Sequence, residues 1–255
     1  MGGLAHYLED EGIPTVGISL IRTHTEKMAP PRALAVPFEL GRPFGPPNEP
    51  DFQRRVLRTL LELLEGHDGP PVLADFPDDP PGSDETDMEG WACPVNFASP
   101  ADDLSDAEIV ERALNQEIAL LKPWYDEAVK AFRRSAFGVS GKTPEEIAGV
   151  VANFVTDPEG TPEPIQGEKK IIGLKRCIDD LRYFYSEAAI ARPDARISDL
   201  AVNNWLWGET TLGKVIVAIR DQLMDEADAT ENAGLKRLAT SAFVPSHQRF
   251  RTKHG

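Results

Sequence analysis

The feature that most constrains this fold is a short apolar run, Thr15 to Ile21, which lies between Pro14 and Arg22. A bounded apolar run of this length, partly β-branched, is typical of a buried strand rather than of a helix. A second apolar run, Ala33 to Phe38, follows the pair Pro30-Pro31. The sequence therefore predicts two buried strands close to the N-terminus.

Helical patterns lie on both sides of these strands. Before them, Leu4 and Leu8 have helical spacing, and Gly12 stands where a helix C-terminal cap usually falls. After them comes a loop, 41–50, that is too rich in proline and glycine for regular structure. Asp51 is then a plausible N-cap for a helix with an apolar face formed by Phe52, Val56, Leu57, Leu60, Leu61 and Leu64. Alternating helices and strands predict a parallel, doubly wound sheet, whose ligands gather beyond the C-terminal ends of the strands.

For the first strand that end is 19–26, where several polar side chains stand close together. Arg22 is a candidate for substrate binding, and His24 is a candidate general acid or base because histidine exchanges protons near neutral pH. The alternative for His24 is a solvated loop histidine. Arg32 and Arg42 are candidates for binding a carboxylate bidentately, and surface ion pairs with the many acids are the alternative.

Composition divides the chain into three parts. Residues 1–66 form the expected α/β unit, residues 67–104 a linker dense in Pro, Gly and Asp, and residues 105–255 a helical domain. Two apolar stretches within the linker, Val72-Leu73-Ala74 and Trp91 to Phe97, suggest segments that dock on a surface. The predicted fold class is thus α/β, with a small parallel sheet flanked by helices and followed by a mainly α-helical C-terminal unit.

Start signals in the helical part follow one another along the chain. Ser105 with Glu108 forms a predicted capping box, and Pro123 is expected to open or kink a second helix. Thr143-Pro144-Glu145-Glu146 is another N-terminal signature, with proline and acids in the first turn. Further helices are expected from about Lys169 to Ala189, after a cap at Ser198, and over Thr210 to Met224.

The joint between the last two helices, Trp205-Leu206-Trp207-Gly208-Glu209-Thr210, has two interpretations. It is either a packed helix junction, which we favour, or a lip over a ligand, in which case Trp207 and Glu209 would bind substrate. Glu117 and Glu187 raise the question of a carboxylate metal site. The helices contain no Glu-x-x-His pair, so we predict no metal.

The chain has two cysteines, Cys93 and Cys177, whose spacing fits neither a CxxC nor a Cys/His metal motif. Cys177 lies on a predicted helix, and we expect it to be buried as a small apolar group. Cys93 is either packed beside Trp91 or a reactive thiol, and in the second case it is a candidate catalytic residue. No sequence signal names a cofactor.

Charge and hydropathy exclude several classes of function. Forty-two acidic against twenty-seven basic residues give a formal charge of -15, which argues against nucleic acid or anionic membranes as partners. No apolar run reaches the roughly 18 residues that a membrane span needs, and no signal peptide opens the chain, so we expect a cytoplasmic protein. Val139-Ser140-Gly141-Lys142 resembles a phosphate loop only superficially, because acids open the next helix. A G-x-S-x-G elbow and a dinucleotide fingerprint are also absent.

The order of the N-terminal segments resembles a known family. A strand like Ile13–Leu20, a residue like Arg32 leading into a second strand, and the loop Gly41-Arg42-Pro43-Phe44-Gly45 resemble the C-terminal part of protein B of the glycine/sarcosine/betaine reductase and D-proline reductase family. The stretches Trp91 to Asn96 and Trp205 to Thr210 resemble the versions of the family that are known only by similarity.

The resemblance implies a reductase component that acts on a small amino-acid-like substrate. A thiolate or selenolate would attack the carbon that bears the amino group, and reduction would resolve the adduct. Arg32 or Arg42 would hold the substrate carboxylate, and His24 would protonate the leaving nitrogen. In the family the nucleophile is a selenocysteine or cysteine just upstream of a helix like Met1–Glu11, and the given sequence begins inside that helix.

The thiol would therefore come from an upstream segment or from a partner subunit, and the resemblance also implies a homo-oligomer. The alternative is a non-catalytic subunit or small-ligand-binding module that partners a thiol-bearing polypeptide.

Overall fold

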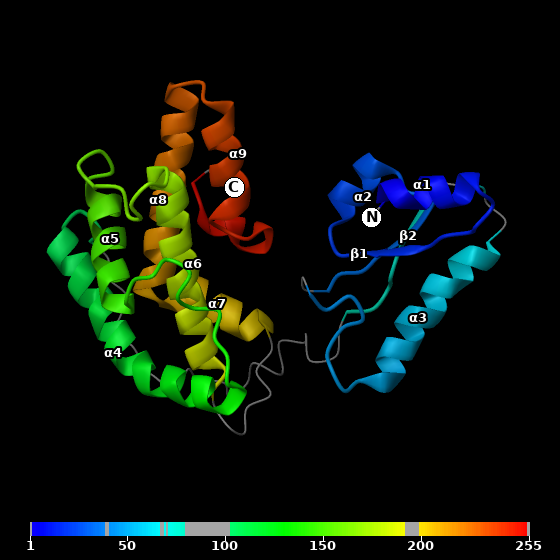
Figure 1. Ribbon diagram of the computed structural model, residues 1–255, viewed down its shortest axis with the longest axis horizontal. Helices are drawn as coiled ribbons and strands as arrows, with labels where there is room; N and C mark the ends of the chain where they lie inside the picture. Colours follow the sequence, from blue (N-terminus) through cyan, green and yellow to red (C-terminus); the bar gives the residue numbers. More distant parts are fainter. Residues whose placement is uncertain are drawn as a thin grey trace. The chain divides into compact units, whose positions relative to one another are not determined.

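The computed structural model describes residues 2–38, 41–66, 69, 71–79, 103–191 and 199–253. The chain separates into two compact units, Met1–Glu89 and Gly90–Gly255, which we call unit 1 and unit 2 (Figure 1). Unit 1 contains a small parallel sheet with helices, and the described part of unit 2 is helical. The predicted α/β class with a helical C-terminal part is therefore confirmed.

Unit 1 alternates helices and strands along its length. Its elements are α1 (Gly2–Asp10), β1 (Gly17–Ser19), α2 (Arg22–Met28), β2 (Arg32–Ala35), α3 (Pro50–Glu65) and β3 (Val72–Asp75). The three strands are parallel in the order β1-β2-β3, and the register places Ile18 beside Leu34 and Leu34 beside Ala74. Because all strands run the same way, the segments that follow them meet at one edge of the sheet, here called the carboxyl edge.

The core of unit 1 lies between the sheet and the apolar face of α3 (Figure 1). Leu34 and Val56 are fully buried within it. Three phenylalanines close the core with ring centroids 5.5 to 5.8 Å apart, in tilted and edge-to-face arrangements that aromatic pairs prefer; they are Phe38, Phe52 and Phe76. This packing fixes the ends of β2 and β3 and thus the carboxyl edge.

Three parts of unit 1 differ from the prediction. The apolar stretch Val72-Leu73-Ala74, expected to dock from a linker, belongs to the third strand of the sheet, β3. The polar residues expected as a loop after β1 instead form α2, a short helix without buried residues. Asp51 lies in the first turn of α3 rather than at its N-cap, which is Glu49.

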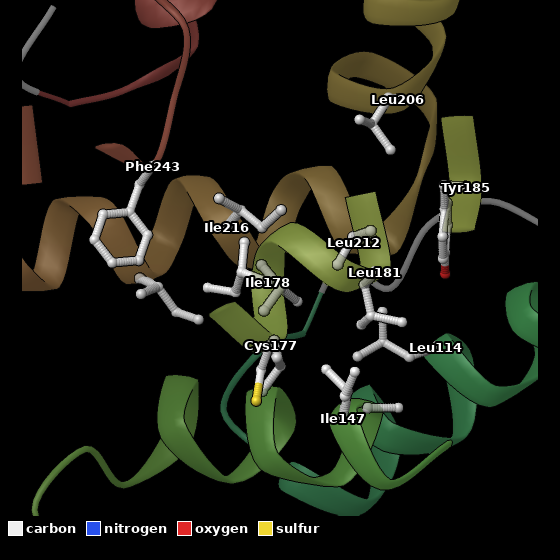
Figure 2. Packing of buried hydrophobic residues seen from close by; sticks show 14 of the residues in the cluster. Leu114, Ile147, Cys177, Ile178, Leu181, Tyr185, Leu206, Leu212, Ile216 and Phe243 are labelled. Atoms are coloured by element: carbon white, nitrogen blue, oxygen red, sulfur yellow. The ribbon is translucent and has the colours of Figure 1, made fainter. Parts of the chain in front are cut away.

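Unit 2 is built from long helices around one core. They are α4 (Ala107–Phe132), α5 (Pro144–Thr156), α6 (Lys170–Ala189), α7 (Asp199–Glu209), α8 (Thr211–Ala229) and α9 (Ala233–Ala242), followed by the 3₁₀ helix η2 (Ser246–Arg251). Figure 2 shows part of this core, with side chains of α4, α5, α6 and α8 such as Leu114, Ile147, Leu181 and Ile216 packed together.

Helix boundaries in unit 2 follow the predicted signals in part. Thr143 caps α5 in a full capping box with Glu146, as its sequence signature predicts. The cap of α4 is Asp106 rather than Ser105, and its carboxylate accepts the N–H groups of two first-turn residues. Pro123 does not open a second helix, because it lies inside α4, which continues through it. The predicted cap at Ser198 lies outside the described residues.

Candidate functional site at the carboxyl edge of the sheet

Charged side chains from two strand ends meet at the carboxyl edge. Arg22 begins α2, the helix that follows β1, and Asp75 ends β3. The Nε of Arg22 donates to Oδ1 of Asp75 at 2.8 Å, and its Nη2 donates to Oδ2 at 3.2 Å. Nη1 of the same guanidinium binds Glu26 on the next turn of α2. Arg22 therefore fastens α2 to β3 through a bidentate fork.

Arg22 and Asp75 shift each other's pKa. The hydrogen bond from Arg22 lowers the pKa of Asp75, and the positive charge acts in the same direction. The Asp75 carboxylate raises the pKa of Arg22 through the same contact. One guanidinium faces two carboxylates here, so this part of the edge carries an excess negative charge.

A pair of hydroxyl groups lies at the end of β1. Ser19 is buried, and its Oγ is hydrogen-bonded to Oγ1 of Thr25 on α2. In the sheet register Ser19 stands beside Ala35, which stands beside Asp75, so this row has a small residue at its centre. We call Ser19, Arg22, Thr25, Glu26 and Asp75 the edge cluster.

The other predicted residues of unit 1 fall in different places. His24 is exposed on α2, within the segment that carries the edge cluster. Arg42 is exposed in the loop that joins β2 to α3, and its carbonyl accepts the N–H of Gly45 at 3.0 Å. A loop that leaves β2 starts at the carboxyl edge, so Arg42 and His24 both belong to segments at this edge.

Arg32 lies at the opposite edge, because it is the first residue of β2. Its Nη1 donates to Oε1 of Glu9 at 2.7 Å, and Glu9 also accepts hydrogen bonds from the N–H and the hydroxyl of Thr15. The hydrogen bond from the Thr15 N–H, and to a smaller extent the hydrogen bond from Arg32, lowers the pKa of Glu9. Arg32 thus joins α1 to the start of the sheet, and the structure does not bring it to the edge cluster.

Trp207 and Glu209 belong to unit 2. Trp207 is 2% exposed within the contact between α7 and α8, and the Arg182 guanidinium lies over its ring, 5.3 Å from the centroid. Glu209, the last residue of α7, is exposed. The buried indole fits the packed-junction interpretation of this stretch rather than the lip.

Glu117 is a buried carboxylate with a structural role, whereas in the sequence it was a candidate only as a metal ligand. Glu117 on α4 is 4% exposed; Oε1 accepts the N–H of Thr211 at 2.6 Å and Oε2 accepts the Tyr185 hydroxyl at 2.9 Å. Burial raises the pKa of Glu117, and these hydrogen bonds oppose the shift. The side chain therefore joins α4 to α6 and to the positive N-terminal end of α8.

The loop that superficially resembles a phosphate site holds a carboxylate of the same chain. Asp180 of α6 is fully buried and accepts the N–H groups of Val139 and Ser140 at 3.1 and 2.8 Å. It also accepts the Ser140 hydroxyl at 2.6 Å. The donors that an anion would need are thus already occupied, which explains why this loop is not a phosphate site.

Of the two cysteines, only Cys177 lies within the described residues. Cys177 is fully buried in the core of unit 2, as its helical position predicts (Figure 2). Burial raises the pKa of its thiol to about 11, so it is a poor nucleophile at neutral pH. Cys93 lies outside the described residues.

Comparison with protein-family models, with curated proteins and with solved structures finds no match to this chain. Within the described ranges no three His, Cys, Asp or Glu side chains gather as a metal site would require. No described helix has both the length and the apolarity needed to cross a membrane.

Proposed function

We propose that this chain is a component of a thiol- or selenol-dependent reductase resembling protein B of the glycine/sarcosine/betaine and D-proline reductases. The substrate is a small amino-acid-like molecule bound at the carboxyl edge of unit 1. The observation that carries this proposal is the edge cluster, in which Arg22 bridges the end of β1 to Asp75 at the end of β3. Ligands of parallel α/β sheets bind at this edge.

The charges of the edge suit a zwitterion. Asp75 and Glu26 outnumber Arg22 in the edge cluster, and a substrate ammonium group would complement this excess negative charge. In our proposal the carboxylate of the same substrate is held by Arg42, from the loop after β2. Arg22 would then be a positioning residue, because its fork is engaged with the two acids.

The chemistry would proceed by displacement and reduction. A thiolate attacks the carbon bearing the nitrogen and the C–S bond forms, while the C–N bond breaks with its electron pair going to the nitrogen, which takes up a proton from His24 as it departs. A second thiol then attacks the sulfur, so that a disulfide forms and the carbon, with the electrons of the C–S bond, takes up a proton. The net result is two thiols oxidised and one C–N bond reduced.

The nucleophile would be supplied by an upstream segment of the protein or, in trans, by a thiol- or selenol-bearing polypeptide. Cys177 does not serve, because its thiol is buried and its pKa is raised. Reduced thiols persist in the cytoplasm, and a cytoplasmic location is part of this proposal.

Calorimetric titration of the full chain with glycine, sarcosine, betaine and D-proline tests the binding step. We expect at least one of them to bind, and Arg42→Ala to weaken it about tenfold or more, because a charged hydrogen bond contributes about 1.5–3 kcal/mol. The matched control is Arg58→Ala, which removes an exposed arginine from α3 of the same unit. No binding by any of the four, or equal loss in both variants, would sink the proposed site.

Turnover measurements distinguish the reductase from the non-catalytic ligand-binding module. With a dithiol and the candidate thiol-bearing partner present, the reductase releases ammonia or an amine from glycine, sarcosine or betaine, or opens the ring of D-proline. His24→Gln should then lower kcat with little change in KM. Binding without any C–N cleavage would favour the alternative, a non-catalytic ligand-binding module.

A further inference from the structure

β1 forms an outer edge of the sheet in unit 1. In the described residues it has one neighbour, β2, and the carbonyl of Ser19 accepts the N–H of Val36 at 2.9 Å. Backbone groups alternate in direction along a strand, so the N–H and C=O of Ile18 point away from β2. The side of β1 that carries the backbone groups of Ile18 is therefore an unfilled place for another strand.

This edge lacks the charges that help to keep sheet edges apart in monomeric proteins, although β1 is only three residues long and Pro14 precedes it. Such edges usually carry charges, prolines or bulges. The opposite edge strand, β3, has Pro71 before it and Pro77 after it, and it ends with the exposed Asp75. Around β1, by contrast, the run 12–21 contains no charged residue in a chain with a formal charge of -15.

Exposed apolar groups flank the same strand. Ile13 is 52% exposed before β1, and Ile21 is 40% exposed after it. Gly17 is also exposed, and a Cβ added there would meet no atom within 4 Å. An uncharged edge strand with exposed isoleucines on both sides is typical of a surface that becomes covered in an assembly.

We propose that β1 pairs with β1 of a second copy of this chain, antiparallel about a two-fold axis at Ile18. In this register Val16 faces Leu20 of the second copy, and these three residues present the outward backbone groups. Close to the two-fold axis each residue lies near its own copy in the second chain, so a charge there would approach a like charge. The uncharged run 12–21 meets that requirement, which is why a second copy is the occupant that fits.

The resulting dimer has one continuous sheet that joins the two three-stranded sheets. This inference is independent of the proposed reductase function. It rests on the free edge of β1, on the lack of charge and on the exposed isoleucines alone.

Light scattering of the full chain tests the pairing. We expect a mass of twice the 28.0 kDa of one chain. Gly17→Lys should halve that mass, because the lysine would face Ser19 of the other copy and lie diagonally across the axis from the second lysine, so that two like charges would come close together. Gly17→Ala is the matched control and should remain dimeric, since a methyl group at this position meets no neighbour. Circular dichroism checks that both variants fold.

Amide hydrogen exchange provides a second measurement. The Ile18 N–H should be protected in the dimer and should exchange rapidly in Gly17→Lys. A wild-type monomer would overturn the proposal; if its Ile18 amide were protected, another part of the same chain would cover β1. A dimer that persists in Gly17→Lys with unchanged protection would overturn it equally.

Discussion

Gly213 provides the sharpest test of the packing in unit 2. It lies in the first turn of α8, where its N–H donates to Oγ1 of the cap residue Thr210 at 3.0 Å. A methyl group at this position would overlap the carbonyl oxygen of Leu206 and come within 2.9 Å of the Cα of Trp207. Both obstacles are backbone atoms of α7, so neither can turn aside as a flexible side chain would.

The cost of Gly213→Ala follows from this geometry. Overpacking a close contact typically costs about 1–3 kcal/mol, and the upper end applies where backbone must move. Alanine gains about 1 kcal/mol over glycine in a helix, which offsets part of that cost. We therefore expect the free energy of unfolding to fall by about 2 kcal/mol.

Gly149→Ala on α5 is the matched control. Its added methyl would lie 3.4 Å from Oε1 of the Glu111 side chain, an ordinary contact. This variant should be as stable as the wild type or more stable by up to about 1 kcal/mol. Urea unfolding followed by circular dichroism and tryptophan fluorescence measures both variants. If Gly213→Ala proves as stable as Gly149→Ala, the close approach of α7 to α8 described here is wrong.

Three further predictions concern unit 2. Because burial raises the pKa of Glu117, the folded chain holds its proton more tightly than the unfolded chain, so this group lowers the free energy of unfolding as pH rises through its folded pKa. Urea titrations across pH should show that fall relative to Glu117→Gln; a constant difference would contradict it. In Cys93→Ser the remaining thiol, Cys177, should react with a maleimide only after unfolding, and rapid labelling of the folded protein would show that it is accessible. Thr143→Ala should cost about 1 kcal/mol in thermal or urea unfolding through loss of the capping box, and an unchanged stability would refute that role.

The elements that sequence predicted best have strong local signals. The runs around Ile18 and Leu34 are short, apolar and bounded by breakers, and both are strands. The signature at Thr143 predicts a helix cap whose partner, Glu146, is only three residues away, so the contact is local. Such features depend little on the rest of the chain.

Long-range contacts could not be predicted in the same way. The third strand, Val72–Asp75, has the same short apolar pattern as the first two, but the surrounding prolines and glycines suggested a linker. Because this strand was not predicted, its last residue, Asp75, was not predicted as the partner of Arg22. Glu117 was recognised as a carboxylate facing other helices, yet only tertiary structure shows that it caps α8.

The position of Arg32 could have been predicted from the direction of its strand. A residue just before a predicted strand lies at the amino edge of a parallel sheet, and Arg42, in the loop that leaves the same strand, follows the carboxyl edge. Strand direction thus separates two arginines that looked equivalent in sequence. The same argument, applied to the third strand, would have pointed to Asp75 as a residue of the carboxyl edge.

Asp180 also indicates a route for the redesign of unit 2. Its side chain accepts the backbone N–H groups of Val139 and Ser140 from inside the fold. Asp180→Gly would remove that acceptor while Gly138 and Gly141, both at positive φ, still favour the turn of the loop. The loop is therefore a natural starting point for building a receptor for a small oxyanion such as phosphate.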